Sequence, residues 1–419
     1  MDLAERLELF ADGRLVERLG GSASLRLHAP QPAGTVLHFD RPWEGAFSGY
    51  VTVLRDGPRF RMYYRGLPVA GRDGSPDEVT CYAESADGIA WRKPDLGLFE
   101  VAGTRANNVV LAGQSPFSHN FAPFLDTRPG VPDGERYKAL AGTSGTGLHA
   151  FASADGIRWR RWRETPLLRE GAFDSQNVGF WSESERCYVI YFRTWTGGGF
   201  SGYRTISRST SPDFATWSEP VPMRFGESPP EHLYTSQTHP YFRAPHLYVA
   251  TPMRFVPGRR VLTEAQASQL GVAVNYAGDV AEAVFMTSRG GDHYDRLFLE
   301  GFIRPGPDLG NWASRAGLTA LGIVPTGPAE MSLYKQAHYA QPGCQLVRHV
   351  LRTDGFVSVH AGFSGGEMLT RPLRFAGRDL VVNFATGAAG GIRVEIQDGN
   401  GVPVRSEEHT SELQSRQYL

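Results

Sequence analysis

A seven-residue motif recurs along the chain and constrains the fold more than any other feature of the sequence. The segment Ser85 to Trp91, SADGIAW, returns at Ser153 to Trp159 as SADGIRW and at Ser211 to Trp217 as SPDFATW. A degenerate fourth copy spans Ser288 to Tyr294, and Thr353 to Phe356 resembles a fifth. Repeats with a period of roughly 60 to 75 residues indicate a chain of similar structural units rather than one continuous core.

The residue types in the motif predict a structural turn. Ser and Asp side chains accept hydrogen bonds from nearby backbone N–H groups, and the aromatic residue anchors the turn against its own sheet. We therefore expect Asp87, Asp155 and Asp213 to stabilise turns rather than to perform chemistry. Helical signals are scarce, and the best is a capping box formed by Thr263 and Gln266 inside a longer insertion.

Short alternating runs lie between the 49 glycines and 28 prolines, which are spread along the whole chain and favour many short strands with tight turns. A repeat that holds about four strands matches one blade of a propeller. The predicted fold is all-β, with a lead-in strand over 1–37, a five-bladed β-propeller over 38–361 and the start of a truncated C-terminal β-sandwich over 362–404. Within this last segment, Glu367 to Phe375 and Leu380 to Gln397 alternate like the opening strands of a sandwich. The predicted blades span about 38–100, 107–166, 172–222, 231–298 and 309–361.

The end of the sequence differs in character from the rest. Residues Arg405 to Ser415 read RSEEHTSELQS, which is what a common sequencing-library adapter gives when it is translated in frame. We expect 405–419 to be such an artefact, with the natural protein cut short near Val404, and we exclude the segment from fold reasoning.

Composition excludes several classes of protein. The 43 basic residues balance 44 acidic ones, so no global positive field exists to bind nucleic acid or an anionic membrane.

Cys81, Cys187 and Cys344 have neither disulfide-framework nor zinc-site spacing, and no metal or cofactor is expected. The N-terminus has no apolar signal-peptide core and no stretch is long enough to span a membrane, so we expect a soluble protein, cytoplasmic as written, with export left open.

The turn motif, the blade length and the propeller-then-sandwich order resemble the five-bladed glycosidases of the invertase, fructosidase and arabinosidase type, glycoside hydrolase families 32, 43 and 68. The resemblance covers about 38 to 400. It implies a bacterial-type enzyme that hydrolyses a glycosidic bond with an Asp/Glu pair at the propeller mouth. Those families carry their acids in N-D-P-N-G, R-D-P and E-C motifs, and this sequence has none of the three. The motif of this sequence differs from the sialidase Asp box, S-x-D-x-G-x-T-W, because Gly directly follows Asp and Trp comes one place earlier. The sequence therefore favours a sialidase less than the families named above.

Asp174 and Glu231 are the predicted catalytic acids. Asp174 is the nearest match to the R-D-P aspartate, whereas Gln237 occupies the place expected for the general-acid glutamate, with Glu231 six residues earlier. For each acid the alternative is a turn carboxylate or an ion-pair partner of an arginine. The reserve candidates are Glu44, Asp279, Glu282 and Glu330.

The starts of the inner strands are unusually polar for buried segments, which fits a polyhydroxylated ligand at the mouth. Arg65, Arg193 and Arg315 follow strand-like segments and are candidates to line the cleft, with inter-blade ion pairing as the alternative. The predicted substrate-binding residues are Trp43, His119, Asn120, Gln176, Asn177, Trp195, Gln237, His239 and Arg315.

Two other functions remain open. A catalytically silent glycan-binding propeller would explain the missing acid motifs, and a protein-interaction scaffold would display an exposed apolar patch instead of a polar pocket. Two carboxylates from different blades that face each other across the mouth would favour the enzyme. A carbohydrate is the expected partner.

Overall fold

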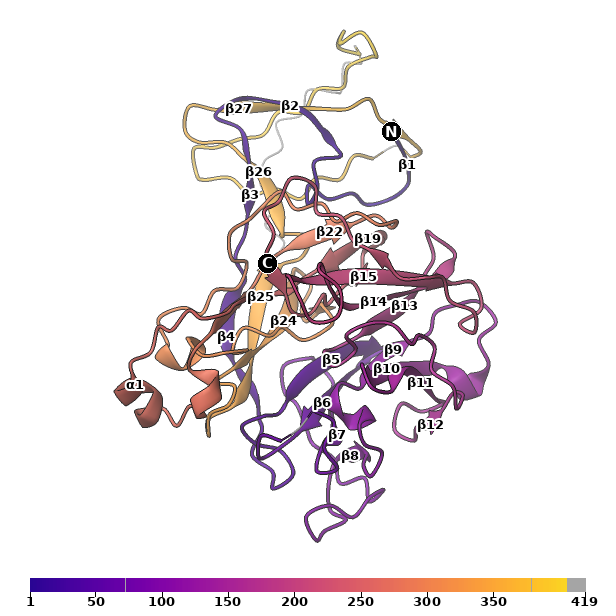
Figure 1. Cartoon of the computed structure of the whole chain (residues 1–419). Helices are drawn as coiled ribbons and strands as arrows, with labels where there is room; N and C mark the ends of the chain where they lie inside the picture. Colours follow the sequence, from indigo (N-terminus) through magenta and orange to yellow (C-terminus); the bar gives the residue numbers. More distant parts are fainter. Residues whose placement is uncertain (72, 378, 405–419) are drawn as a thin grey trace. The chain divides into compact units, whose positions relative to one another are not determined.

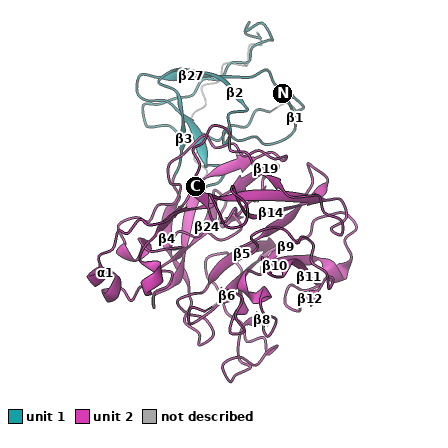
Figure 2. Ribbon diagram, viewed as in Figure 1, with its two compact units in different colours: residues 1–28, 352–419 teal, residues 29–351 magenta. Residues whose placement is uncertain are grey.

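The computed structural model describes residues 1–71, 73–377 and 379–404, and these are nearly all β-strand and turn, with almost no helix (Figure 1). The chain divides into two compact units. Unit 1 comprises 1–28 and 352–419, and unit 2 comprises 29–351 (Figure 2). The predicted adapter-derived segment 405–419 lies outside the described residues.

Unit 2 contains antiparallel sheets of four strands, most of them formed by strands that follow one another along the chain. Their order is β5-β6-β7-β8, β9-β10-β11-β12, β13-β14-β15-β16 and β23-β24-β25-β4. The strands are β4 Gln31–His38, β5 Gly49–Asp56, β6 Arg59–Gly66, β7 Val79–Ser85, β8 Val109–Leu111, β9 Ala122–Leu125, β10 Tyr137–Thr143, β11 Gly147–Ser153, β12 Arg160–Arg161, β13 Val178–Ser182, β14 Cys187–Trp195, β15 Arg204–Ser211, β16 Val221–Pro222, β23 Val324–Pro325, β24 Glu330–Ala337 and β25 Gln345–Arg352.

Between the third and the last of these sheets the chain forms two three-stranded sheets, β17-β20-β21 and β18-β19-β22. The predicted helix is confirmed here, because the Thr263 side chain caps the Gln266 N–H while the Gln266 side chain caps the Thr263 N–H. The elements are β17 His232–Leu233, β18 His239–Tyr241, β19 Ala244–Ala250, β20 Met253–Val256, α1 Glu264–Gln269, β21 Val280–Ala283 and β22 Met286–Ser288, with single 3₁₀ turns at η1 Phe117–His119, η2 Asp133–Glu135, η3 Val274–Tyr276 and η4 Leu309–Asn311.

The first strands of successive sheets contact one another in chain order. Strand β5 contacts β9, β9 contacts β13, β13 contacts β18, and β23 returns to contact β5. Strand β4, from the start of unit 2, completes the sheet formed by β23 to β25. Figure 1 shows these sheets around the middle of the unit, so the segments that precede the first strands meet there.

The recurrent motif forms the predicted turn. In the first copy Ser85 Oγ accepts the Gly88 N–H at 2.9 Å, and Asp87 Oδ1 accepts the N–H groups of Ile89 and Ala90 at 2.8 Å each. The Trp91 indole N–H donates to the Gly88 carbonyl at 3.1 Å. The copy at Ser153 repeats the Ser and Asp contacts. The copy at Ser211 repeats the Asp contacts, while Ser211 Oγ accepts the Asp213 N–H at 3.3 Å, and all three aspartates thus have the predicted structural role.

Apolar side chains fill the spaces between neighbouring sheets. One buried cluster joins Phe124 and Leu140 of the second sheet to Ile190 and Phe192 of the third. Such packing stabilises each sheet only against its neighbours, as expected for a fold built from repeated units. Several buried polar residues, among them Asn120, Ser175 and Gln176, lie shortly before the first strands of sheets.

Unit 1 pairs segments from the two ends of the chain in two-stranded sheets: β1 Asp2–Ala4 with β28 Arg374–Phe375, β2 Val16–Gly21 with β27 Gly366–Thr370, and β3 Ser24–Leu27 with β26 Val357–His360. The alternation over Leu380 to Gln397 predicted strands, but the structure forms none there. Leu380 and Val381 are 66% and 86% exposed, so this segment has the strand pattern without a sheet to pack against.

Candidate active site

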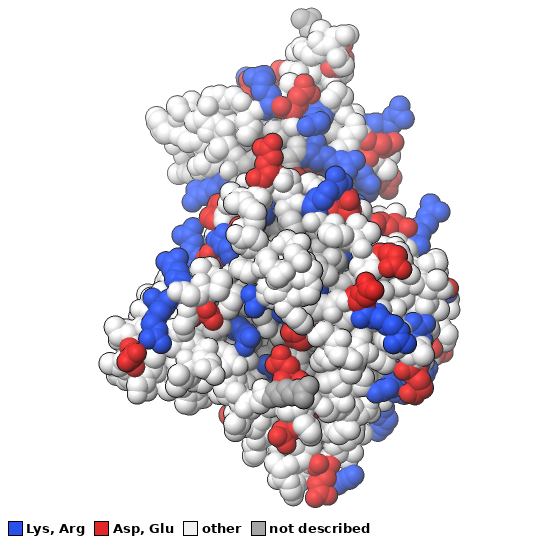
Figure 3. All heavy atoms as spheres, viewed as in Figure 1, with Lys and Arg blue, Asp and Glu red and all other residues white. Residues whose placement is uncertain are grey.

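A small polar cavity in unit 2 is lined by residues from several sheets and from the connections between strands. Its volume is about 20 Å³, which is room for about one water molecule. Figure 3 shows basic and acidic side chains gathered in a hollow on the visible face of this unit. The titratable side chains that line the cavity are Tyr50, Arg65, Asp73, Glu78, His119, Tyr234, Tyr276, Arg315 and Tyr339.

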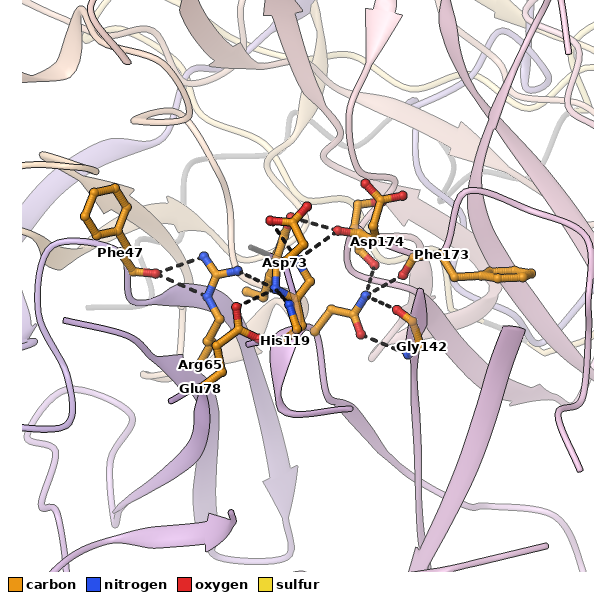
Figure 4. Close-up of polar contacts among 12 residues, drawn as sticks. Phe47, Arg65, Asp73, Glu78, His119, Gly142, Phe173 and Asp174 are labelled. Atoms are coloured by element: carbon orange, nitrogen blue, oxygen red, sulfur yellow. Dashed lines mark hydrogen bonds and ion pairs between the residues drawn. The ribbon is translucent and has the colours of Figure 1, made fainter. Parts of the chain in front are cut away.

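Glu78 and His119 form a buried pair at this cavity. Glu78 directly precedes β7, and His119 ends η1, so two segments far apart in the sequence supply the pair. Glu78 Oε1 lies 2.9 Å from His119 Nδ1, and Glu78 Oε2 is buried without a hydrogen-bond partner in the described structure (Figure 4). The same ring nitrogen accepts hydrogen bonds from the Arg65 guanidinium at 3.1 Å and from the Gly74 N–H at 3.3 Å.

Asp174 is the predicted acid that the structure brings to this place, and its backbone is fixed on both sides. His119 Nε2 donates to the Asp174 carbonyl oxygen at 3.1 Å. The adjacent Asn120 amide donates to the carbonyl oxygens of Phe173 and of Ser175, the latter at 2.8 Å (Figure 4). Three successive carbonyl groups are thus held by two adjacent side chains, which positions the aspartate with little freedom.

The carboxylate of Asp174 is ionised at neutral pH. Burial alone would raise its pKa, but the Arg193 guanidinium, which donates to Oδ2, lowers the pKa below the ordinary aspartate value. Its other oxygen, Oδ1, is buried and has no hydrogen-bond partner in the described structure. A buried anionic oxygen without a partner is unusual in a folded protein, and it makes Asp174 a candidate functional residue.

The backbone is strained at the cavity. Tyr50 has φ +50° and Arg315 has φ +63°, in the left-handed region that side chains other than glycine rarely adopt. Such strain persists only where the surrounding structure enforces it, and it concentrates at functional sites. Eight other non-glycine residues of the described ranges have a positive φ without lining the cavity, so Tyr50 and Arg315 support this site only together with its polar contacts.

The predicted site residues divide into two groups. His119 and Arg315 line the cavity, and Asp174 adjoins it through contacts with His119 and Tyr50. Glu231 does not line it, because its carboxylate is bound by Arg254 at 3.3 Å and Arg296 at 2.8 Å. Its assignment as the second acid stays a prediction.

Most of the predicted ligand-binding amides are engaged in joining sheets. The Gln237 amide donates to Gln176 Oε1 at 2.8 Å and to the Thr319 carbonyl at 2.6 Å, while the Gln176 amide donates to Thr52 at 2.8 Å. Asn177 donates to the Phe173 and Ser175 carbonyl groups at 3.0 Å each. These amides therefore hold strands in position. Whether they also contact a sugar stays a prediction.

The other predicted residues lie in similar structural settings. The His239 ring bridges the Gln237 carbonyl at 3.0 Å and the Ile323 N–H at 3.1 Å. Trp43 is buried and donates to Asn108 at 2.9 Å, whereas Trp195 packs under the guanidinium of Arg204. The reserve acids also have partners: Tyr64 and Lys93 for Glu44, the Gly258 N–H for Asp279, Arg254 for Glu282 and Arg348 for Glu330.

Sequence reasoning missed Glu78, Asp73 and Tyr234. Asp73 and Glu78 come from the connection between β6 and β7, which carries no inner-strand pattern. The available signal was an acid placed directly before the apolar run Val79 to Ala83. Asp73, which is 63% exposed in its side chain, lies 3.9 Å from His119 at the mouth.

Over the described ranges, no group of three or more His, Cys, Asp and Glu side chains is arranged to hold a metal ion. Within the same ranges, no helix is long and apolar enough to cross a membrane.

No protein-family model and no curated protein matches this sequence. Solved structures do match. A protein described as a glycoside hydrolase superposes with a TM-score of 0.51 at 12% identity, over 77% of this chain and 92% of that chain. A second solved structure, a complex of BT0996 with RGII, superposes with the same TM-score and identity, over 78% of this chain and 92% of that chain. The predicted resemblance is confirmed for the fold: this chain has a fold that is found in glycoside hydrolases.

Proposed function

We propose that the protein is a glycoside hydrolase that acts at the cavity of unit 2. Under this proposal, the sheets of unit 2 are the five blades of a β-propeller. Strands β17 to β22 form the fourth blade, and β4 is the last strand of the fifth. The contacts between first strands in chain order support this arrangement. Unit 1 is then the start of a β-sandwich, for which the paired strands β1 to β3 and β26 to β28 give the support.

The observation that carries the proposal is the position of His119 between two acidic residues: its Nδ1 contacts the Glu78 carboxyl group at 2.9 Å, and its Nε2 contacts the backbone carbonyl of Asp174 at 3.1 Å. Glycoside hydrolysis requires one ionised carboxylate and one proton donor on opposite sides of the scissile bond. Asp174 has a lowered pKa and supplies the anion, whereas Glu78 with His119 supplies the proton.

In the proposed reaction the bond between the anomeric carbon and the leaving oxygen breaks. The leaving oxygen takes the proton shared by Glu78 and His119, and Asp174 stabilises the positive charge that develops at the anomeric carbon. A water molecule then supplies the new oxygen on that carbon. Its proton returns to the Glu78 and His119 pair, which restores the starting state.

A non-catalytic glycan-binding protein is the second candidate. The observation that favours it is the ion pair between Asp174 and Arg193, which holds the proposed catalytic anion in the resting structure. In an enzyme, Asp174 must act on the substrate while it is paired with Arg193. In a binding protein, Asp174 and Arg193 need only form hydrogen bonds with the glycan.

Hydrolysis of a panel of aryl glycosides and oligosaccharides by the full chain tests the proposal. We expect turnover of at least one member, with a rate that follows enzyme concentration. Saturable binding of a glycan without turnover on any member would favour the binding protein instead.

A further inference from the structure

Three guanidinium groups surround one tyrosine beside the proposed catalytic anion. The guanidinium carbons of Arg193, Arg204 and Arg315 lie 4.9, 5.7 and 5.3 Å from the centre of the Tyr234 ring. They come from three segments far apart in the sequence, so their convergence is a property of the fold. Cation–π attraction to one ring is too weak to compensate the repulsion among three like charges.

The charges in this cluster are not balanced. Asp174 forms an ion pair with Arg193, but within the described residues neither Arg204 nor Arg315 forms an ion pair with any carboxylate. The acids on the other side of the cavity, Glu78 and Asp73, face His119. An excess of positive charge therefore remains at the Tyr234 end of the cavity.

Hydrogen-bond donors in the cluster are also unused. The Nε atoms of Arg193, Arg204 and Arg315 are all buried, and none has a hydrogen-bond partner in the described structure. The side chain of Arg193 is only 4% exposed. Buried N–H donors without acceptors are costly, and three in one place indicate a missing acceptor.

Two further observations agree with a missing anion. Burial together with the positive charges of Arg193 and Arg315 lowers the pKa of Arg204 below the ordinary arginine value. Arg315 also holds its guanidinium at the cavity from a strained backbone. Arg348, whose Nε is also buried without a partner, differs in that it forms an ion pair with Glu330.

We propose that Arg193, Arg204 and Arg315 form an anion subsite, which binds an acidic substituent of the sugar, a carboxylate, sulfate or phosphate group. The guanidinium fork matches the oxygens of all three groups and can donate two parallel hydrogen bonds to them. The hydroxyl groups of Tyr234 and Tyr50, which lie 3.3 Å apart, are further hydrogen-bonding groups beside the cluster. The inference that the ligand is a sugar rests on the proposed function. The inference that the ligand is negatively charged rests on the arginine cluster.

Binding without turnover tests this subsite separately from hydrolysis. Isothermal titration calorimetry of the full chain with glucuronate, glucose 6-sulfate, glucose 6-phosphate and glucose should show binding of at least one acidic sugar and none of glucose at the same concentration. The acidic sugar that binds identifies the anionic group. Equal binding of glucose and the acidic sugars would overturn the inference, as would inorganic sulfate that binds as tightly as they do.

The variant Arg315→Gln should weaken binding of the acidic sugar about 10- to 100-fold, because it removes a charged donor. Its melting temperature should not fall, since the change also relieves repulsion between the guanidinium groups. The control Arg224→Gln removes an exposed arginine that pairs with Asp292, and should leave binding unchanged.

Unchanged binding in a folded Arg315→Gln protein would overturn the inference. Should that variant fail to fold, Arg204→Gln is measured in the same way and must weaken binding.

Discussion

At the residue scale, the candidate site depends on the adjacent side chains of His119 and Asn120. Together they hold the carbonyl groups of Phe173, Asp174 and Ser175. Sequence reasoning found these polar residues but assigned the amides to ligand binding, because a pattern of residue types does not show which donors the backbone will use. Asp174 could be predicted from its polar strand start. Glu78 could not, because a connection between strands has no periodicity that marks which side chains turn inward.

The first prediction separates the two candidate proton donors. Glu78→Gln keeps the size of the side chain but cannot give up the shared proton, so kcat should fall about 10²- to 10⁴-fold with the fold intact. The matched control is Glu231→Gln, which breaks contacts with Arg254 and Arg296 and should lower the melting temperature while most of kcat remains. Loss of kcat in Glu231→Gln with full activity in Glu78→Gln would reverse the assignment.

At the scale of elements, the turn motif was the part of the structure most open to prediction. Its hydrogen bonds are local, so Ser85, Asp87 and Trp91 specify the turn without knowledge of the rest of the fold. Strand alternation was less reliable. The pattern over Leu380 to Gln397 gave no strand, because a strand also requires a partner that the local sequence does not contain.

A turn aspartate should affect stability and not activity. Asp87→Ala leaves the N–H groups of Ile89 and Ala90 without their acceptor, and we expect a loss of about 1 kcal/mol in the free energy of unfolding. Urea denaturation measures this loss. The control Asp95→Ala changes an exposed aspartate and should have no effect on stability. A folded Asp87→Ala protein with much reduced kcat would contradict the structural role of the turn.

At the scale of the whole molecule, the repeat predicted an all-β fold made of similar sheets, and the structure is nearly all β. The repeat could not show where the acids would meet, because the site forms only when the starts of several sheets converge. Contacts such as His239 with Ile323 and Gln237 with Gln176 join segments far apart in the sequence. These contacts form only when sheets from distant parts of the chain come together, and a local sequence pattern cannot predict them.

One of these joining contacts predicts the pH dependence of stability. Burial lowers the pKa of His239 to about 4, while the unfolded chain titrates near 6.5. Because the unfolded state takes up a proton first, stability should be complete above about pH 6.5 and fall as the pH drops toward about 4, by about 3 kcal/mol. Urea denaturation across this range should show a smaller fall in His239→Gln than in the wild type. The exposed His293→Gln control should keep the full dependence, and an unchanged slope in His239→Gln would contradict the assignment.

The central claim is that Asp174 acts as the ionised carboxylate in glycoside hydrolysis, and the most direct test is kcat/KM of Asp174→Asn on a substrate that the wild type hydrolyses. The matched control is Asp213→Asn, an aspartate in one of the turns of the same unit. We predict that Asp174→Asn loses at least about 10²-fold in kcat/KM in a protein that still folds, with a lower melting temperature than the control because the buried Arg193 loses its ion-pair partner. A folded Asp174→Asn protein with kcat/KM equal to that of the control would contradict the account.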